Sequence, residues 1–300
     1  MLKRRRFLTG ALFIAVSVGL ALPPAPTDGA QADGWRPLFN GADLTGWDTW
    51  LSRPHRSVEG LPLKKNDKGD YLEPVGLNKD PKKVYTVVQE DGKPAIRISG
   101  EIFGALTSQE EFENYHLRLE FKWGEKKWPP RDKAVRDSGL LYHCVGPHGG
   151  GTGGPWMQSA ECQIQEGDCG DFWSVLGVLV DVEGERKDGK GPVIYRRGGS
   201  KFTVPLPGKE PGGNRIIKSA DYEKPTGQWN TIEIMVVGNR SVHLVNGKPN
   251  MVLTNIRRRV DGKEEPLTRG KIQLQSEGAE VYYRNIAIRP LQSIPEEYLK

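Results

Sequence analysis

The chain has 300 residues, of which 36% are hydrophobic, and it contains 37 glycines and 22 prolines. This composition is typical of a β protein rich in turns and argues against a helical bundle. The formal charge of +5 is carried partly by the N-terminus, and no basic stripe with interleaved aromatic residues follows. The sequence therefore predicts no nucleic-acid partner.

The first 32 residues have the three parts of a signal peptide. Lys3–Arg6 is basic, Ala11–Leu22 is apolar, and Ala30-Gln31-Ala32 is a small-residue cleavage site. The apolar run is short for a membrane span, and Arg4-Arg5-x-Phe7-Leu8 matches a twin-arginine export signal. We expect a periplasmic or secreted bacterial protein without a permanent membrane span; a retained signal anchor is the alternative.

The first part of the mature chain contains short strands and one very regular strand. Residues 35–47 form a strand and a turn, residues 50–95 are a polar insertion or long loop, and strands follow at 95–99 and 101–107. Tyr115–Trp123 alternates apolar and polar residues. Successive side chains of a strand point to opposite faces, so Lys122 and the other polar residues face away from the core.

The most polar predicted strands lie in the middle of the chain. In Asp137–Cys144, the alternation places Gly139, Leu141 and His143 on one face. In Ser159–Gln165, it places Glu161, Gln163 and Gln165 on one face. A carboxylate and two amides in a row, followed by a Gly- and Asp-rich bend and Trp173, are typical of a sugar-binding groove. A solvated strand face is the alternative.

Strands continue to the C-terminus. They are expected at 175–182, 228–237, 241–245, 270–275 and 281–288, with a tight hairpin turn at Asn246-Gly247. Gln273, Gln275, Tyr282 and Arg284 share the polar side of the last two. Many short strands with little helical periodicity indicate an all-β sandwich or jelly roll. We expect one domain over residues 33–292 and a short tail over 293–300.

Six motifs in order then resemble one family. They are Leu38-Phe-Asn-Gly-x-x-Leu-x-Gly-Trp47, Asp137-Ser-Gly-Leu-Leu-Tyr-His143, Glu161-x-Gln163-Ile164, Trp229-Asn230, His243-x-x-Asn246-Gly247, and Gly270-x-Ile-x-Leu-Gln275 with Tyr283-Arg-Asn-Ile286. Over residues 35–290 the chain resembles the 3-keto-disaccharide hydrolase domain family. The resemblance implies a concanavalin-like jelly roll of two antiparallel sheets, with the site on a concave sheet.

This chain departs from the family pattern at two motifs. The usual Asn-Ser-Gly…Phe-Arg strand is Asp137-Ser-Gly…Tyr-His143 here, and the usual Gln-Asp-His-Gly is Gln275-Ser-Glu-Gly278. The substrate and the activity can therefore differ from those of other members.

The resemblance implies cleavage of glycosides that a separate oxidoreductase has oxidised at C3. A 3-keto group makes the C2 hydrogen acidic, so a base can remove it and expel the C1 aglycone by β-elimination, with or without later addition of water. We expect Glu161 or His143 as the base and Arg284 or Lys122 at the oxyanion. Binding of the sugar is expected from Asp137, Gln163, Gln275 and Tyr282, with Trp173 stacking on the ring. Structural ion pairs are the alternative for the charged members.

The sequence assigns no cofactor, and calcium or another divalent cation is the alternative. Glu166, Asp168 and Asp171 in the bend offer oxygen ligands that suit calcium, although turn formation explains them equally well. The cysteines are Cys144, Cys162 and Cys169. In an oxidising compartment, Cys162 is expected to pair with Cys169 or with Cys144 if a disulfide forms.

Two other functions remain open from the sequence. A retaining glycosidase needs two carboxylates about 5–5.5 Å apart, and Glu161 with Glu166 has the spacing of such a pair only if a bulge turns both to one face. A carbohydrate-binding module would have the same fold without turnover, and fold alone does not separate these functions. A binding module should tolerate Glu161→Gln, whereas either enzyme should lose its rate.

Overall fold

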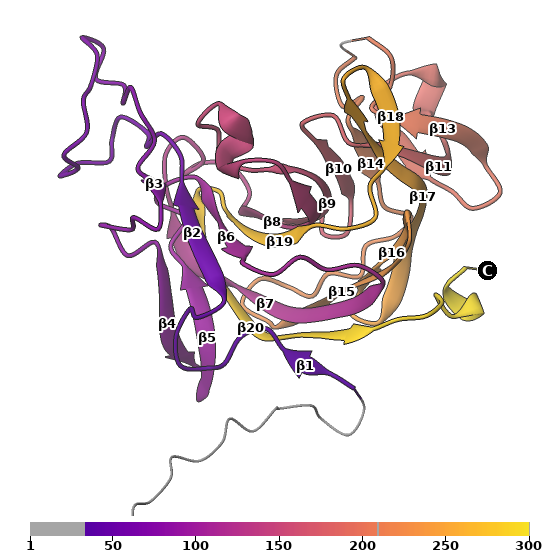
Figure 1. Cartoon of the computed structure of the whole chain (residues 1–300), viewed down its shortest axis with the longest axis horizontal. Helices are drawn as coiled ribbons and strands as arrows, with labels where there is room; N and C mark the ends of the chain where they lie inside the picture. The colour runs from indigo at the N-terminus through magenta and orange to yellow at the C-terminus, as the bar shows by residue number, and fades with distance from the viewer. Residues whose placement is uncertain (1–33, 209, 300) are drawn as a thin grey trace, which may run out of the picture.

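The computed structural model describes residues 34–208 and 210–299 as a sandwich of two twisted sheets (Figure 1). The predicted signal peptide lies outside the described residues. Within the described part, no helix is long and apolar enough to span a membrane. The fold is a jelly-roll β-sandwich, which confirms the fold class predicted from the strand pattern.

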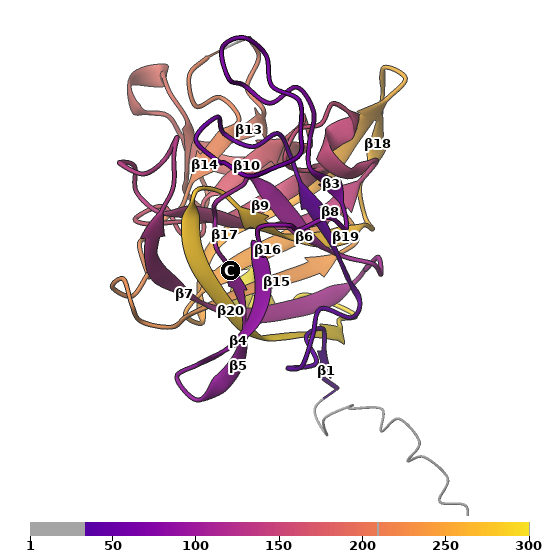
Figure 2. The same ribbon diagram turned by 90° about the vertical axis from the view of Figure 1, so that its left-hand side faces the viewer.

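Sheet A is the layer that contains the long alternating strand. Its order is β4–β5–β20–β7–β15–β16–β17, and β1 also pairs with β20. The strands are β1 (Arg36–Pro37), β4 (Tyr85–Glu90), β5 (Lys93–Ile98), β7 (Tyr115–Lys127), β15 (Asn230–Val237), β16 (Arg240–Val245), β17 (Lys248–Val260) and β20 (Ala279–Pro290). The β4–β5 hairpin projects beyond the sandwich (Figure 2).

Sheet B is the layer that contains the predicted polar strands. Its order is β3–β2–β6–β19–β8–β9–β10–β14–β12–β11, with β13 paired to β11. The strands are β2 (Trp47–Leu51), β3 (Gly76–Leu77), β6 (Gly104–Ser108), β8 (Asp137–Val145), β9 (Gln158–Gln165), β10 (Phe172–Val175), β11 (Leu179–Glu185), β12 (Val193–Tyr195), β13 (Ser200–Val204), β14 (Arg215–Ile217) and β19 (Lys271–Ser276).

Strand β17 joins the two sheets. Its first part pairs with β16 of sheet A, and its second part pairs with β11 and with β18 (Lys263–Pro266) of sheet B. Figure 1 shows the ends of sheet B, at β2 and β14, rising above its middle strands, so the face of sheet B that points away from sheet A is concave.

The core lies between the sheets, as the alternation predicts. From sheet A, Leu117, Leu119 and Phe121 have no exposed surface, and Leu140 and Ile164 of sheet B are equally buried. Burying each such side chain contributes roughly 1.5–3 kcal/mol. One polar pair in this core joins the two layers. The hydroxyls of Ser138 and Tyr283 form a hydrogen bond of 2.7 Å, as expected for buried polar groups.

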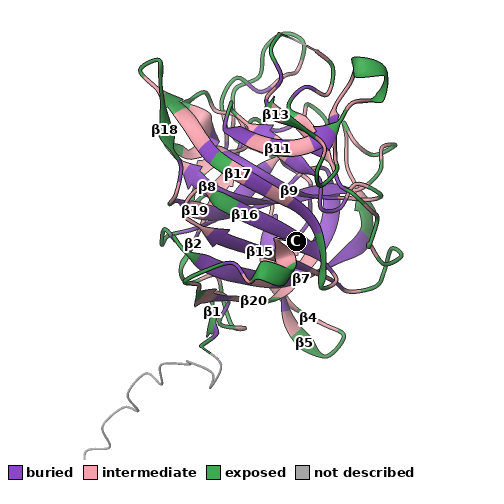
Figure 3. Cartoon of the chain, turned by 90° about the vertical axis from the view of Figure 1, so that its right-hand side faces the viewer, coloured by how far each residue is buried: buried purple, intermediate pink, exposed green. Residues whose placement is uncertain are grey.

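Short 3₁₀ helices and the chain ends cover the edges of the sandwich. The helices are η1 (His148–Gly151), η2 (Lys187–Gly189) and η3 (Glu296–Tyr298). Near the C-terminus, Ile294 packs against Met235 and Leu244 on the outside of sheet A. Figure 3 shows that burial runs continuously through the middle strands, whereas exposed residues gather in the turns.

None of the three cysteines forms a disulfide. Cys144, Cys162 and Cys169 are free and buried. Cys162 and Cys169 belong to the main core, whereas Cys144 lies in a small apolar cluster with Leu141 and Met157. The pairings considered from the sequence are therefore not formed in this structure, and the thiols act as small apolar side chains.

Candidate active site

The residues expected in one site are divided between the outer faces of the two sheets. Alternation in β8, β9 and β19 places Asp137, Glu161 and Gln275 on the concave face of sheet B. Alternation in β7 and β20 places Lys122 and Arg284 on the outer face of sheet A. The core separates the two groups, so they do not form one site.

On the concave face, Glu161 and Gln275 meet above a glycine. A Cβ atom on Gly139 would lie 2.3 Å from Glu161 Oε1 and 2.4 Å from Gln275 Oε1. These distances are far below a van der Waals contact, so the missing side chain of Gly139 makes the space that both groups occupy. Glu161 is 5% exposed and Gln275 is fully buried. The sequence therefore builds a polar floor on β8, β9 and β19.

Two further acids border this floor. Asp137 Oδ2 accepts a hydrogen bond from Gln165 at 2.6 Å and forms an ion pair with Arg131 at the same distance. Glu277 follows β19 directly, two residues after Gln275, and is partly buried. Asp137, Glu161 and Glu277 influence one another's ionisation. The concave face thus gathers three carboxyl groups with one guanidinium.

Several buried polar atoms on this face have no hydrogen-bond partner among the described residues. They include both amide atoms of Gln275, Oδ1 of Asp137, Nε of Arg131 and Nε1 of Trp173. Leaving a buried donor or acceptor unpaired costs about 1–3 kcal/mol, so such atoms are rare in a folded protein. Their concentration around Glu161 indicates a surface made to contact a polar ligand.

The carboxyl groups have strongly shifted pKa values. Burial, reinforced by the charge of Asp137, raises the pKa of Glu161 well above its usual value. The nearby Gln275 amide opposes this rise in pKa, although neither of its amide atoms forms a hydrogen bond with the carboxylate. Burial raises the pKa of Asp137 to about 6 despite the opposing charge of Arg131. Burial followed by the charges of Asp137 and Glu161 raises the pKa of Glu277. A raised pKa suits a group that exchanges protons near neutrality.

Two other predicted residues complete the concave face. Trp173 pairs with Glu161 across β10 and β9, and the Arg215 guanidinium lies 5.6 Å from the centre of its indole ring. Gln163 is 5% exposed, and its Oε1 accepts the backbone N–H of Ile164 at 2.9 Å. The indole therefore borders the floor, while the Gln163 oxygen is already engaged.

His143 does not share the face of Glu161, which corrects the prediction made from alternation. The pairing of β8 with β9 shifts between Tyr142 and Val145, and His143 has φ of +52°. A bulge of this kind turns one side chain to the other face. His143 instead lies against the rings of Tyr115 and Tyr142. Burial there lowers its pKa to about 4.

Lys122, Tyr282 and Arg284 form a structural network on sheet A, which also corrects the prediction. Arg284 Nε donates to Glu120 Oε2 at 2.7 Å, and its guanidinium lies 3.7 Å from the centre of the Trp229 ring. Lys122 donates to Asp91 at 2.8 Å and lies 5.9 Å from the Tyr282 ring centre. Lys122 and Arg284 therefore form structural ion pairs, which was the alternative to a role in the site.

The acids of the bend do not form the calcium site considered from the sequence. Glu166 Oε1 pairs with Arg136 at 2.8 Å, and Asp168 and Asp171 both pair with Arg215, at 2.7 and 2.5 Å. Among the described residues, no group of three or more His, Cys, Asp or Glu side chains is arranged to hold a metal ion. Because Glu166 is occupied by Arg136 and by the Thr226 hydroxyl, it is also not a free second carboxylate for a retaining glycosidase.

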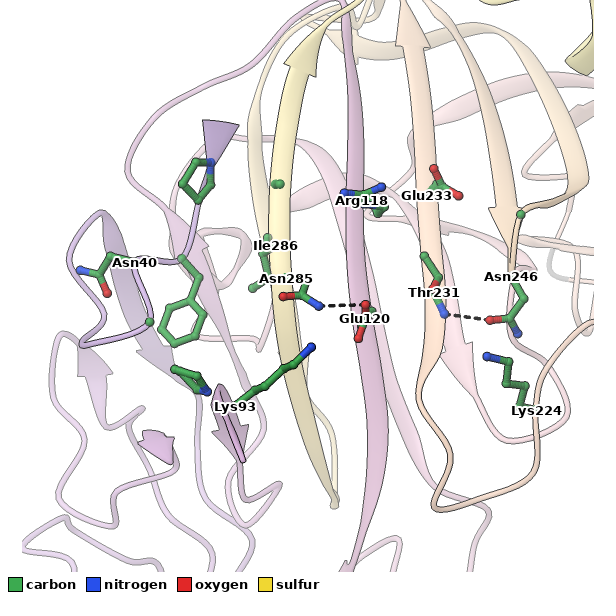
Figure 4. Close-up of a pocket in the computed structure, with 16 residues that line it drawn as sticks. Asn40, Lys93, Arg118, Glu120, Lys224, Thr231, Glu233, Asn246, Asn285 and Ile286 are labelled. Atoms are coloured by element: carbon green, nitrogen blue, oxygen red, sulfur yellow. Dashed lines mark hydrogen bonds between the residues drawn. The ribbon is translucent and has the colours of Figure 1, made fainter. Parts of the chain in front are cut away.

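A hollow of about 900 Å³ lies on the outer face of sheet A (Figure 4). It is lined by Arg118, Glu120 and Glu233 among others. Its acids are already paired: Asn285 donates to Glu120 at 2.8 Å, and the ring of His116 lies 2.8 Å from Glu233. The hollow is spacious, but both of its acids have partners, so it offers no free carboxylate comparable to Glu161.

The chain combines a jelly-roll sandwich with polar groups on the concave face of one sheet. The family model of the 3-keto-alpha-glucoside-1,2-lyase-like domain matches residues 34–289, so the chain belongs to that family. This confirms the resemblance seen in the sequence. The search of curated proteins returned no match.

Solved structures with a similar architecture are distant in sequence. One is a protein of Parabacteroides distasonis, provisionally assigned as a glycosyl hydrolase. It has 19% identity and a TM-score of 0.48, over 89% of this chain and 99% of the other. A β-glucanase of Bacillus licheniformis has 11% identity and a TM-score of 0.40, over 87% of this chain and all of the other.

Two residues of the concave face were missed from the sequence. Arg131 lies in a polar loop between β7 and β8, and no periodicity points to it. Glu277 stands where the family pattern usually has histidine, and this departure was the signal that would have found it. The structure adds both to the site.

Proposed function

We propose that the protein cleaves the glycosidic bond of 3-keto-glycosides by removing the C2 proton and eliminating the C1 aglycone. The support is the family membership together with one observation, the buried carboxylate of Glu161. Among residues 34–208 and 210–299, no ion pair neutralises it. A carboxylate with a raised pKa and no cationic partner is a stronger base than an exposed one.

In this proposal, Glu161 takes the C2 proton. The C2–H electrons form the C1–C2 double bond, the C1–O bond breaks, and the aglycone oxygen accepts a proton. The products are a 3-keto sugar with a C1–C2 double bond and the free aglycone alcohol. If the reaction proceeds beyond elimination, addition of water across that double bond completes the hydrolysis.

Other groups of the concave face fit the remaining tasks. The enediolate that develops at C3 needs a donor, and Arg131 has a buried Nε–H without a partner. Arg131 therefore replaces Arg284 in the proposed role. The free amide of Gln275 suits a sugar hydroxyl, and the Trp173 indole suits stacking and donates from Nε1.

The substrate requires an oxidoreductase that acts earlier on C3 of the sugar. The leader predicted over residues 1–32 would export the protein to the periplasm or the medium, which a fractionation of cells with and without Arg4→Lys and Arg5→Lys would test.

The direct test is release of p-nitrophenol from p-nitrophenyl 3-keto-glucosides of both anomers, beside the unoxidised glucosides. We expect turnover of the keto compounds alone and loss of at least 10²-fold in Glu161→Gln, the usual contribution of a general base. Turnover of plain glucosides would instead indicate a glycosidase. Saturable glycan binding without any turnover would indicate a binding module and overturn the proposal.

A further inference from the structure

Glu277 lies on the same face as the proposed base. In β19, Leu274 and Ser276 point into the sandwich, where the Ser276 hydroxyl donates to the backbone oxygen of Ile102 at 2.7 Å. Alternation therefore directs Gln275 and the next outward residue, Glu277, to the concave face.

The strand register brings Glu277 to Asp137. Gln273 is opposite Leu141 and Leu274 is opposite Leu140, and the same antiparallel register, continued to the end of β19, sets Glu277 opposite Asp137. The charges of Asp137, Glu161 and Arg131 all act on Glu277. The three acids and the guanidinium are therefore one electrostatic group.

This group has more acids than cations. Arg131 pairs with Asp137, whereas the other guanidinium groups nearby in the chain are used elsewhere: Arg136 by Glu166, and Arg215 by Asp168 and Asp171. Lys122 is on the opposite side of the sandwich. Three carboxyl groups around one guanidinium do not all ionise readily, so the group retains a proton.

The amide of Gln275 is an independent sign that this cluster faces a ligand. It is fully buried, reaches over Gly139 beside Glu161, and has no hydrogen-bond partner on either amide atom. An acidic cluster kept only for packing would leave no reason for such an unpaired amide.

We propose that Glu277 is the general acid that protonates the leaving aglycone oxygen while Glu161 removes the C2 proton. This inference rests on the function proposed above. The elimination takes one proton from C2 and delivers one to oxygen, so an ionised Glu161 and a protonated Glu277 provide both partners. Glu161 is at the buried floor, whereas Glu277 is partly exposed, so Glu277 faces the side from which the aglycone can leave.

The experiment compares two leaving groups. Methyl 3-keto-glucoside expels an alkoxide that needs an acid, whereas the p-nitrophenyl compound expels a stable phenolate. We expect Glu277→Gln to lose about 10²–10⁴-fold with the methyl compound and to change much less with the p-nitrophenyl compound. Exchange of the C2 hydrogen in D₂O, corrected for the rate without enzyme, should persist in Glu277→Gln and disappear in Glu161→Gln.

Matched variants keep the result interpretable. Glu125→Gln makes the same charge change at an exposed position of β7 and should leave both rates unchanged. Glu277→His supplies another acid and should restore part of the methyl-glucoside rate. Circular dichroism confirms that each variant is folded.

Failure of this inference differs from failure of the proposed function. If wild-type protein exchanges and cleaves but Glu277→Gln cleaves both compounds normally, or loses exchange as Glu161→Gln does, Glu277 is not the acid. If the wild type neither exchanges nor cleaves, the proposed function fails and the acid role fails with it. A ¹³C titration of the glutamate carboxyls then tests their electrostatic coupling: the pKa of Glu161 should fall in Glu277→Gln, and an unchanged value overturns the coupling.

Discussion

The outer faces of the two sheets are both polar, but they are built in opposite ways. On sheet A, Glu120 is bonded by Arg284 and Asn285, and Lys122 is bonded by Asp91. On sheet B, Glu161 has no ion pair among the described residues, and the side-chain amide of Gln275 has no hydrogen bond. The hollow of about 900 Å³ lies on sheet A, whereas the unpaired Gln275 amide and the unpaired Asp137 oxygen lie on sheet B.

The difference shows how a stabilising surface and a reactive one are distinguished. Burial alone would raise the pKa of Glu120, but the bonds from Arg284 and Asn285 outweigh it and keep the pKa below the usual value. Burial without such bonds raises the pKa of Glu161. Shifted and unpaired groups are the ones that gather at functional sites, so chemistry locates the site better than volume does.

Exchanging one acid on each face should have the largest effect and tests the comparison directly. We expect Glu161→Gln to reduce kcat on 3-keto-glycosides by about 10²–10⁴-fold, while Glu120→Gln changes it less than about threefold because Glu120 only pairs within its sheet. Steady-state kinetics on the purified variants measure both. The reverse pattern would move the site to the hollow of sheet A.

Filling the space at Gly139 should have the next largest effect. The Cβ of Gly139→Ala would displace Glu161 and Gln275, and a misplacement of about 1 Å can cost about 100-fold in rate. Overpacking should also cost about 1–3 kcal/mol of stability. Kinetics and urea unfolding of the same sample separate the two effects. Unchanged kinetics would show that Glu161 is not held in a reactive position.

Low pH should lower the free energy of unfolding through two histidines buried in the protein. Burial lowers the pKa of His143 and of His243 to about 4, from an ordinary 6.5. The unfolded chain therefore binds protons more tightly, so stability is full above pH 6.5 and falls as the pH drops toward 4, by about 3 kcal/mol for each histidine at most.

Urea unfolding between pH 7 and pH 4 measures this loss. His143→Asn, which suits the positive φ, should make the free energy of unfolding less dependent on pH. His55→Asn, near the surface, should leave this dependence unchanged. An equally steep curve in His143→Asn would show that this histidine is not the titrating group.

Removing the guanidinium from sheet A should affect stability and leave catalysis unchanged. Arg284→Gln loses the bond to Glu120 and the stacking on Trp229, which together are worth about 1 kcal/mol at a partly buried position. Thermal unfolding measures the loss, and kcat and KM should stay at wild-type values. A large decrease in kcat would return Arg284 to the active site.

A reducing agent should have the smallest effect. Because all three cysteines are free and buried, dithiothreitol should leave Tm unchanged, and a thiol reagent should label the protein only after unfolding. Labelling of a single thiol after denaturation without a reductant would instead reveal a disulfide between the other two.

Much of the fold could be predicted from alternation. The strands at 115–123, 137–144 and 159–165 correspond to β7, β8 and β9, and their apolar residues face the core. Strand β17 was missed, although a turn at Asn246-Gly247 precedes it, because its 13 residues include Arg257 and other charged residues. Pairing across both sheets, which is not local, makes it a strand.

The site could be predicted only in part. Asp137, Glu161, Gln163, Gln275 and Trp173 do share the concave face. His143 was misplaced because one extra residue in β8 reverses the side to which its side chain points, and such a bulge leaves no mark on the alternation. Arg131 was missed because it reaches Asp137 from a loop.

The sequence by itself determined which side chains of the regular strands face the core, because this follows from the two-residue repeat of an extended chain. It also determined the family, through six motifs in order. Only the tertiary structure decided which sheet each strand joins, since the repeat is the same in both. That choice placed Gln275 beside Glu161 and put Arg284, nine residues further along the chain, on the far side of the sandwich.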